Sequence, residues 1–146
     1  MEVLMKQTSG ITLERLIQRL SIMKNQAPKA AALGAMLPLR KQVAKSFSQQ
    51  KDPDGSAWAP LKYKKLLRGH KILEGLKDYF SFWAYGPSVK VSNRKYYTTY
   101  HHTGTRYMAR RGFLPESNKK ADEQWAKPIR VGAQKSILRL LKRGGV

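Results

Sequence analysis

The feature that most constrains this chain is the block Asp52-Pro-Asp-Gly-Ser-Ala-Trp-Ala-Pro-Leu61. Pro53 fixes φ at about −65°, and Gly55 tolerates a positive φ, so the block predicts a tight turn. Trp58 follows the turn, and its ring needs an apolar pocket with an acceptor for the indole N–H. We therefore predict a rigid corner anchored by Trp58, with Asp52, Pro53, Asp54 and Gly55 as its turn residues.

The Asp-x-Asp-Gly order within this block also occurs in calcium-binding loops, but the spacing here excludes that reading. Such loops need Gly at their sixth position and Glu at their twelfth. Here Gly55 is fourth and Tyr63 is twelfth, counting from Asp52. The block is therefore interpreted as a structural turn.

The size and composition of the chain predict a single folded domain. It has 146 residues, of which 41% are hydrophobic and 10% aromatic, and it contains no cysteine. This excludes disulfides and thiolate zinc sites, and no apolar run is long enough to span a membrane. We expect an N-terminal helical arm over residues 1–27, a core over 28–143, no membrane association and a cytoplasmic location in the host cell.

The charge of the chain is its most extreme property. Lys and Arg number 29 against 9 Asp and Glu, which gives a formal net charge of +20. Residues 1–73 carry 14 basic and 4 acidic side chains and residues 74–146 carry 15 and 5, so each half has a net charge of +10. The excess therefore belongs to the folded body, and it predicts contact with a polyanion or with an acidic protein surface.

Hydrophobic periodicity predicts helices in the first third of the chain. Residues 11–24 form an amphipathic helix whose stripe we assign to core packing: Leu13, Leu16, Ile17, Leu20 and Met23. A second helix is expected from Pro28 to about Gln50, with a kink or break at Pro38 because proline lacks the helical N–H donor.

The middle and end of the chain predict a small sheet and a last helix. The runs Tyr79–Tyr85 and Ser88–Ser92 alternate around Gly86-Pro87 and predict a β-hairpin whose first strand is partly covered on both faces. Residues 61–67 are interpreted as a loop or one helical turn, 96–104 as a strand or a short helix, and 106–112 as a basic loop. An amphipathic helix then ends near Arg143. The fold class is α+β, with N-terminal helices, a small antiparallel sheet and a C-terminal amphipathic helix.

Nothing in the sequence indicates catalysis or a cofactor. Adjacent residues such as His101 and His102 point in different directions from a strand or a helix, so they rarely bind one metal ion together. There is no phosphate-binding glycine loop, no nucleophile elbow, and no acidic pair at a spacing typical of acid–base chemistry. We therefore predict a protein that is not an enzyme, with no cofactor and no metal.

Several motifs in order resemble the phage virion morphogenesis (tail completion) family of Mu-like contractile-tailed phages. They are Phe47, the Asp52–Gly55 turn with Trp58-Ala-Pro-Leu-Lys62, Ile72-Leu73 with Gly75, Tyr97-x-x-x-His101-x-x-Gly104, and Arg111-Gly-Phe-Leu114 before a C-terminal helix. The likeness covers about residues 30–143. Gly112 departs from the family pattern, which usually has proline at that position.

This resemblance implies a structural protein of the phage neck, located in the virion, that forms a ring at the top of the tail. Relatives among head–tail joining proteins commonly form rings of six subunits. The implied partners are further copies of the chain, the neighbouring tail-tube, terminator and head-connector proteins, and packaged double-stranded DNA through non-specific contacts. Arg106, Arg110 and Arg111 are the candidates for the DNA channel or for docking, and Tyr97, His101 and Phe113 for subunit contacts.

Two other functions stay open at this point. The chain has the size and class of a tail terminator ring, and its charge also suits a monomeric nucleic-acid-binding module. A nuclease is a third class, since basic phage proteins include several. The oligomeric state separates a ring from a monomeric module, and the salt dependence of DNA binding tests for phosphate contacts.

Overall fold

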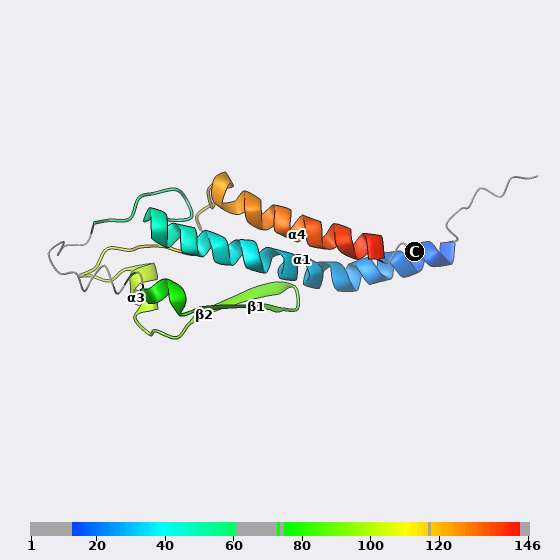
Figure 1. Ribbon diagram of the computed structural model, residues 1–146, viewed down its shortest axis with the longest axis horizontal. Helices are drawn as coiled ribbons and strands as arrows, with labels where there is room; N and C mark the ends of the chain where they lie inside the picture. The colour runs from blue at the N-terminus through cyan, green and yellow to red at the C-terminus, as the bar shows by residue number, and fades with distance from the viewer. Residues whose placement is uncertain (1–12, 61–72, 74, 117, 144–146) are drawn as a thin grey trace, which may run out of the picture.

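The computed structural model describes residues 13–60, 73, 75–116 and 118–143 of the chain (Figure 1). In chain order the elements are α1 (Leu13–Gln49), β1 (Phe80–Tyr85), β2 (Ser88–Asn93), α3 (Thr98–Thr103) and α4 (Glu123–Arg143). α1 lies in the middle, with α4 on one side and the hairpin on the other. The predicted α+β class is confirmed.

α1 is a single helix of 37 residues that contains both Pro28 and Pro38. The prediction of two helices was therefore wrong, and of the kink or break expected at Pro38 the break does not occur. Pro38 removes the donor for the Gly34 carbonyl, but this part of α1 packs closely on α4. A Cβ atom added to Gly132 would lie 2.7 Å from Pro38 Cγ and would collide with the Gly34 carbonyl oxygen. Tertiary packing at this crossing offsets the cost of the proline.

α4 runs antiparallel to α1 along the same seam. Near its start the Trp125 indole N–H donates to Ser46 Oγ at 3.3 Å, and farther along Gly132 and Ser136 approach Gly34. α4 is described to Arg143, which agrees with the predicted extent of the C-terminal helix. None of its residues, all of which are described, is fully buried, so α4 covers α1 without being enclosed itself.

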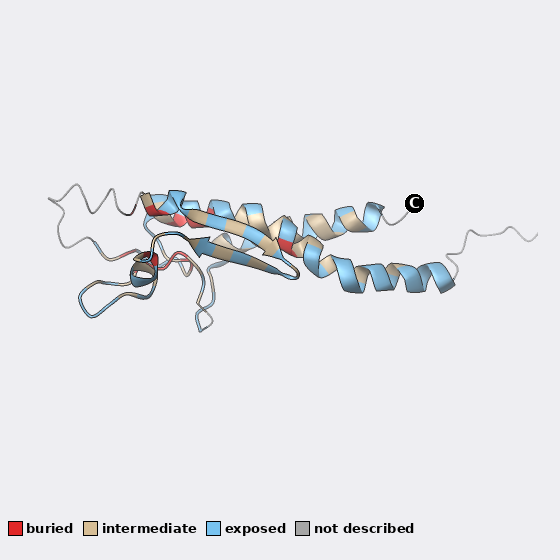
Figure 2. Cartoon of the chain, turned by 90° about the horizontal axis from the view of Figure 1, so that it is seen from below, coloured by how far each residue is buried: buried red, intermediate tan, exposed pale blue. Residues whose placement is uncertain are grey.

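The predicted hairpin is present as an antiparallel pair of strands, with Phe80 opposite Asn93 and Tyr85 opposite Ser88. Phe80, Phe82 and Ala84 are half-buried, and Ser81, Trp83 and Tyr85 are exposed. Figure 2 shows this alternation of half-buried and exposed residues along the strands. The expected cover on both faces of the first strand was therefore wrong. Only the face that lies against α1 is covered.

The ambiguous stretch at residues 96–104 forms the short helix α3, and Gly104 follows it with a φ of +79°. A helical turn at residues 75–78 leads into β1. The predicted loop or turn at 61–67 lies outside the described residues. Among those described, no helix combines the length and the apolar character needed to span a bilayer.

The core is an aromatic cluster where α1, the corner, β1 and the segment before α4 meet. Phe47 at the end of α1 contacts Trp58 edge-on at 5.3 Å and stacks on Phe113 at 5.5 Å, measured between ring centroids. Phe80 of β1 meets Phe113 at 5.0 Å. The cluster joins segments far apart in the sequence and fixes the corner against the sheet.

Candidate functional site

The corner has the geometry of a tight turn. The Gly55 N–H donates to the Asp52 carbonyl at 3.0 Å, and the Asp52 N–H donates to the Ser56 carbonyl at 2.8 Å. Gly55 has a φ of +89°, which side chains other than that of glycine rarely adopt. Beyond the turn, Lys51 and Ala57 pair as an antiparallel bridge. The turn therefore directs the Asp52 side chain and Trp58 toward the same neighbouring segment.

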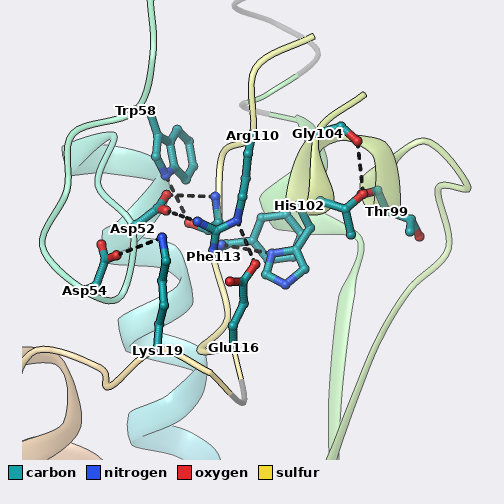
Figure 3. Close-up of polar contacts among 12 residues, drawn as sticks. Asp52, Asp54, Trp58, Thr99, His102, Gly104, Arg110, Phe113, Glu116 and Lys119 are labelled. Carbon is teal, nitrogen blue, oxygen red and sulfur yellow. Dashed lines mark hydrogen bonds and ion pairs between the residues drawn. The ribbon is translucent and has the colours of Figure 1, made fainter. Parts of the chain in front are cut away.

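That segment is residues 110–113, and Asp52 holds it through its carboxylate (Figure 3). Oδ1 of Asp52 accepts the Gly112 N–H at 2.8 Å, and Oδ2 accepts Nη1 of Arg110 at 2.8 Å. The Asp52 side chain is only 9% exposed, so water screens this ion pair weakly. A proline at position 112 would have no N–H to donate, so Gly112 creates one of the two bonds.

Trp58 binds the other backbone group of Gly112. Its indole N–H donates to the Gly112 carbonyl at 3.0 Å in a buried environment. The N–H and the C=O of Gly112 are therefore both bound by the corner, one by Asp52 and one by Trp58. This arrangement fixes a segment more than 50 residues away in the chain, and it is a structural clamp.

Further ion pairs extend the clamp toward α4. Nε of Arg110 lies 2.8 Å from Glu116 Oε1, and the Lys119 ammonium lies 3.7 Å from Asp54 Oδ2. The Ser56 backbone N–H, with the Ser56 side chain, Lys119 and Arg110 as smaller causes, lowers the pKa of Asp54 below its usual value. Asp54 is thus held as a carboxylate.

Two of the three arginines expected at a DNA channel are used inside the chain. Arg111 is 4% exposed and donates to the Ala59 carbonyl at 3.2 Å, and burial lowers its pKa. Arg110 is paired with Asp52 and Glu116. Arg106 is the exposed member of the three, with its guanidinium 5.8 Å from the centre of the Tyr107 ring. Arg106 is therefore the most exposed of the three, and a role for these arginines at DNA or in docking stays a prediction.

The three residues expected at subunit contacts also differ in their exposure. Phe113 is 3% exposed and belongs to the aromatic core, so in this fold it is not available to another subunit. Tyr97 and His101 are half-buried, with ring centroids 6.3 Å apart. The His101 carbonyl accepts the Arg111 N–H at 2.8 Å. His101 therefore helps to position the clamped segment.

Burial affects both histidines. It lowers the pKa of His101, with a smaller contribution from the Arg111 charge, and it lowers the pKa of His102, where Arg110 adds to the effect. Nδ1 of His102 accepts the Phe113 N–H at 3.4 Å, which requires the neutral ring. In the described part of the chain, no group of three His, Cys, Asp or Glu residues comes together as a metal site would need.

A polar pocket of about 180 Å³ lies between α1, the corner and the start of α4. Its lining includes Gln42, Lys45, Asp122 and Trp125, and it contains no histidine. The one lining carboxylate that belongs to the clamp, Asp52, already binds Gly112 and Arg110. The pocket has no paired nucleophile and base.

The most prominent feature of the described surface is its exposed apolar area. The stripe predicted to pack into the core at residues 13–20 is exposed, which corrects that prediction. Leu13, Leu16, Ile17 and Leu20 are 45–70% exposed, and Trp83 and Tyr85 are 42% and 64% exposed. Such patches on a folded chain mark contact surfaces for other proteins. In the sequence, the exposed patch on α1 is visible as an apolar stripe that continues beyond the part of α1 that α4 covers.

The comparisons with known proteins agree with the motifs. The phage virion morphogenesis family matches residues 7–136 of the chain. No curated protein and no solved structure matches it. Since the family match covers far more than half of the sequence, the chain belongs to the phage virion morphogenesis family, a family of structural phage proteins.

Proposed function

We propose, with membership of this family as the premise, that the protein is a neck component of the virion: copies assemble as a ring at the top of the tail and complete it for joining to the head. A tail terminator ring is the alternative within the same class. In either case the chain acts by assembly, and its function depends on surfaces that contact other subunits.

The observation that carries this proposal is the balance between buried and exposed apolar residues. Among the described residues, only Leu76 has a large side chain with essentially no exposure, whereas fifteen large hydrophobic residues are at least 39% exposed. Several are aromatic, and aromatic side chains are enriched at protein interfaces. A chain that leaves so much apolar surface uncovered is suited to permanent contacts with neighbours.

The charge distribution supports a position beside DNA or acidic subunits. α4 has no acidic residue after Glu123, and the exposed side chains of Lys127, Lys135 and Lys142 follow one another along it. α1 has no acidic residue after Glu14. Rings built from such subunits repel themselves unless anionic neighbours lie close. A neck through which DNA passes provides them.

The deciding experiment is localisation in the particle. A phage with a nonsense codon in this gene should make filled heads and separate tails, and a complementing tagged copy should restore joined particles with the label at the neck by electron microscopy. Joined, infectious particles without the protein, or a label along the tail shaft or at its distal end, would contradict the proposal.

The basic face of α4 also favours a second candidate, a monomeric nucleic-acid-binding module. Size-exclusion chromatography with light scattering separates the two, since the module stays monomeric at every concentration. For either candidate, each phosphate contact on duplex DNA should contribute about −0.9 to the slope of log K against log salt. A flat salt response would indicate docking to acidic protein instead.

A further inference from the structure

We infer that the first turns of α1 dock on a second copy of this chain, against the open face of its β1–β2 hairpin. The inference rests on the proposed ring and specifies which two surfaces form it. We call residues 13–22 the arm. We call the outward side of the hairpin, with Ser81, Trp83, Tyr85 and Lys90, the open face.

The arm continues a helix stripe that is covered elsewhere in the molecule. At spacings of three and four residues the stripe runs through Leu13, Leu16, Leu20, Met23, Ala27, Ala30, Gly34 and Pro38. From Met23 onward these positions are half-buried, and at Gly34 and Pro38 the stripe lies against α4. The three leucines before Met23 are exposed. The same face of one helix therefore changes from covered to uncovered at about residue 23.

The change coincides with the end of α4. α4 crosses α1 at Gly132 and Gly34 and continues for eleven residues to Arg143, a rise of about 16 Å. The same rise along α1, in the opposite direction, reaches about residue 23. In both views the arm extends past α4 and past the hairpin (Figures 1 and 2). No described element of the same chain continues the seam along the arm, and we assign the cover of its apolar stripe to a second molecule.

The open face is the matching surface on that second molecule. Trp83 and Tyr85 are exposed there, and the Lys90 ammonium lies over the Tyr85 ring, 4.1 Å from its centre, so the aromatic surface carries one positive charge. The opposite face already packs on α1 through Phe80. Packing on α1 gives the hairpin the support it needs for stability, so the exposed aromatic residues of the open face are free to contact another molecule.

The dimensions of the two surfaces agree. Ten residues of helix extend about 15 Å, and strands of six residues extend about 20 Å. Because the rigid helix carries the arm beyond the hairpin of its own chain, the two surfaces can only meet between copies. The contact joins different patches on the two partners, which is the heterologous type that closes a ring.

Cross-linking tests the contact directly, because the chain has no cysteine of its own. Leu16→Cys and Ser81→Cys, purified separately and mixed under oxidising conditions, should form a disulfide-linked mixed dimer. Gln134→Cys, on the exposed side of α4, is the matched control and should not link to Leu16→Cys. Absence of the mixed dimer overturns the inference. So does an efficient Leu16→Cys homodimer, which would show that arms pair with each other.

Charge substitutions test how strongly the arm contributes to self-association. Leu16→Glu with Leu20→Glu should weaken self-association, measured by sedimentation or light scattering, by about tenfold or more. Leu33→Glu with Leu37→Glu is the matched control: both leucines are equally exposed on α1 but lie off the stripe, and this variant should assemble normally. Circular dichroism should show all variants folded, since the four positions are exposed. A wild-type chain that stays monomeric at every concentration contradicts the inference.

The outcomes separate this inference from the proposed function. If the arm variant still forms rings and joins heads to tails, the ring uses another surface, and only the inference fails. If the Leu16–Ser81 cross-link forms but labelled protein is absent from the neck, the contact is real and the neck assignment fails.

Discussion

Replacement of Asp52 by Ala is the most direct test of the clamp. The Asp52 side chain binds both Gly112 and Arg110, each at 2.8 Å, and it is nearly buried. Its removal leaves the Gly112 N–H without an acceptor in a buried residue, and it leaves Arg110 with Glu116 as its remaining ion-pair partner. The rest of the corner, including Gly55 and Trp58, is unchanged in sequence.

The magnitude follows from these two losses. An unsatisfied buried N–H costs about 1–3 kcal/mol, and the loss of a charged hydrogen bond from a partly exposed arginine adds about 1–2 kcal/mol. We expect Asp52→Ala to lower the free energy of unfolding by about 3 kcal/mol. Asp52→Asn retains one oxygen that can accept the Gly112 N–H, so its cost should be smaller, about 2 kcal/mol.

Urea unfolding followed by far-UV circular dichroism measures the effect. With a slope of about 2 kcal/mol per molar urea for a chain of this size, the Ala variant should unfold about 1.5 M earlier than the wild type. Asp78→Asn is the control, because Asp78 is an exposed acid away from the clamp, and its midpoint should not move. If Asp52→Ala lies within about 0.5 kcal/mol of the wild type, Asp52 does not hold the clamp.

Three other predictions concern the remaining contacts. Gly34→Ala should destabilise by about 2 kcal/mol, because its Cβ would lie 2.5 Å from Ser136 Cβ, whereas Gly75→Ala, with open space around it, should be neutral or stabilising in the same urea assay. Trp58→Phe should cost about 1–2 kcal/mol through the lost bond to Gly112, and the exposed Trp83→Phe should cost almost nothing. The free energy of unfolding should fall as pH drops below about 6.5, because burial lowers the folded-state pKa of both histidines and the unfolded chain therefore binds protons first. His102→Gln should make this pH dependence weaker. A wild-type stability that does not change with pH would contradict the prediction.

Local chemistry made the corner predictable from sequence. Pro53 fixes its own φ, Gly55 permits the positive φ that the turn needs, and Trp58 indicates a buried ring. The sequence could not identify what the corner binds. Gly112 carries no side chain, and its two backbone groups become important only once a segment 60 residues from Asp52 lies beside it. The hairpin and the end of α4 were predictable for the same local reason, since glycines mark both.

The errors share a physical cause, which is tertiary packing that a local pattern does not contain. Pro38 breaks an isolated helix, but α4 packs across that point and α1 continues. The same packing gives Arg110 and Arg111 partners within the chain, Asp52 and the Ala59 carbonyl, that their basic loop does not indicate, and their proposed role at DNA or in docking stays a prediction. The stripe at Leu16 had the period of a core helix, but α4 does not reach it and it is exposed.

The placement of the few acidic residues explains how this chain can be both folded and strongly basic. Five of the nine lie in or next to the clamp and the start of α4: Asp52, Asp54, Glu116, Asp122 and Glu123. There they neutralise Arg110, Lys119 and Arg130. The long helices are then left almost entirely without negative charge, so ion pairs between basic faces cannot join one copy to the next. In the ring that we propose, contacts between copies therefore depend on apolar surfaces such as the arm and the open face, and the exposed lysines of α4 face the proposed anionic neighbours.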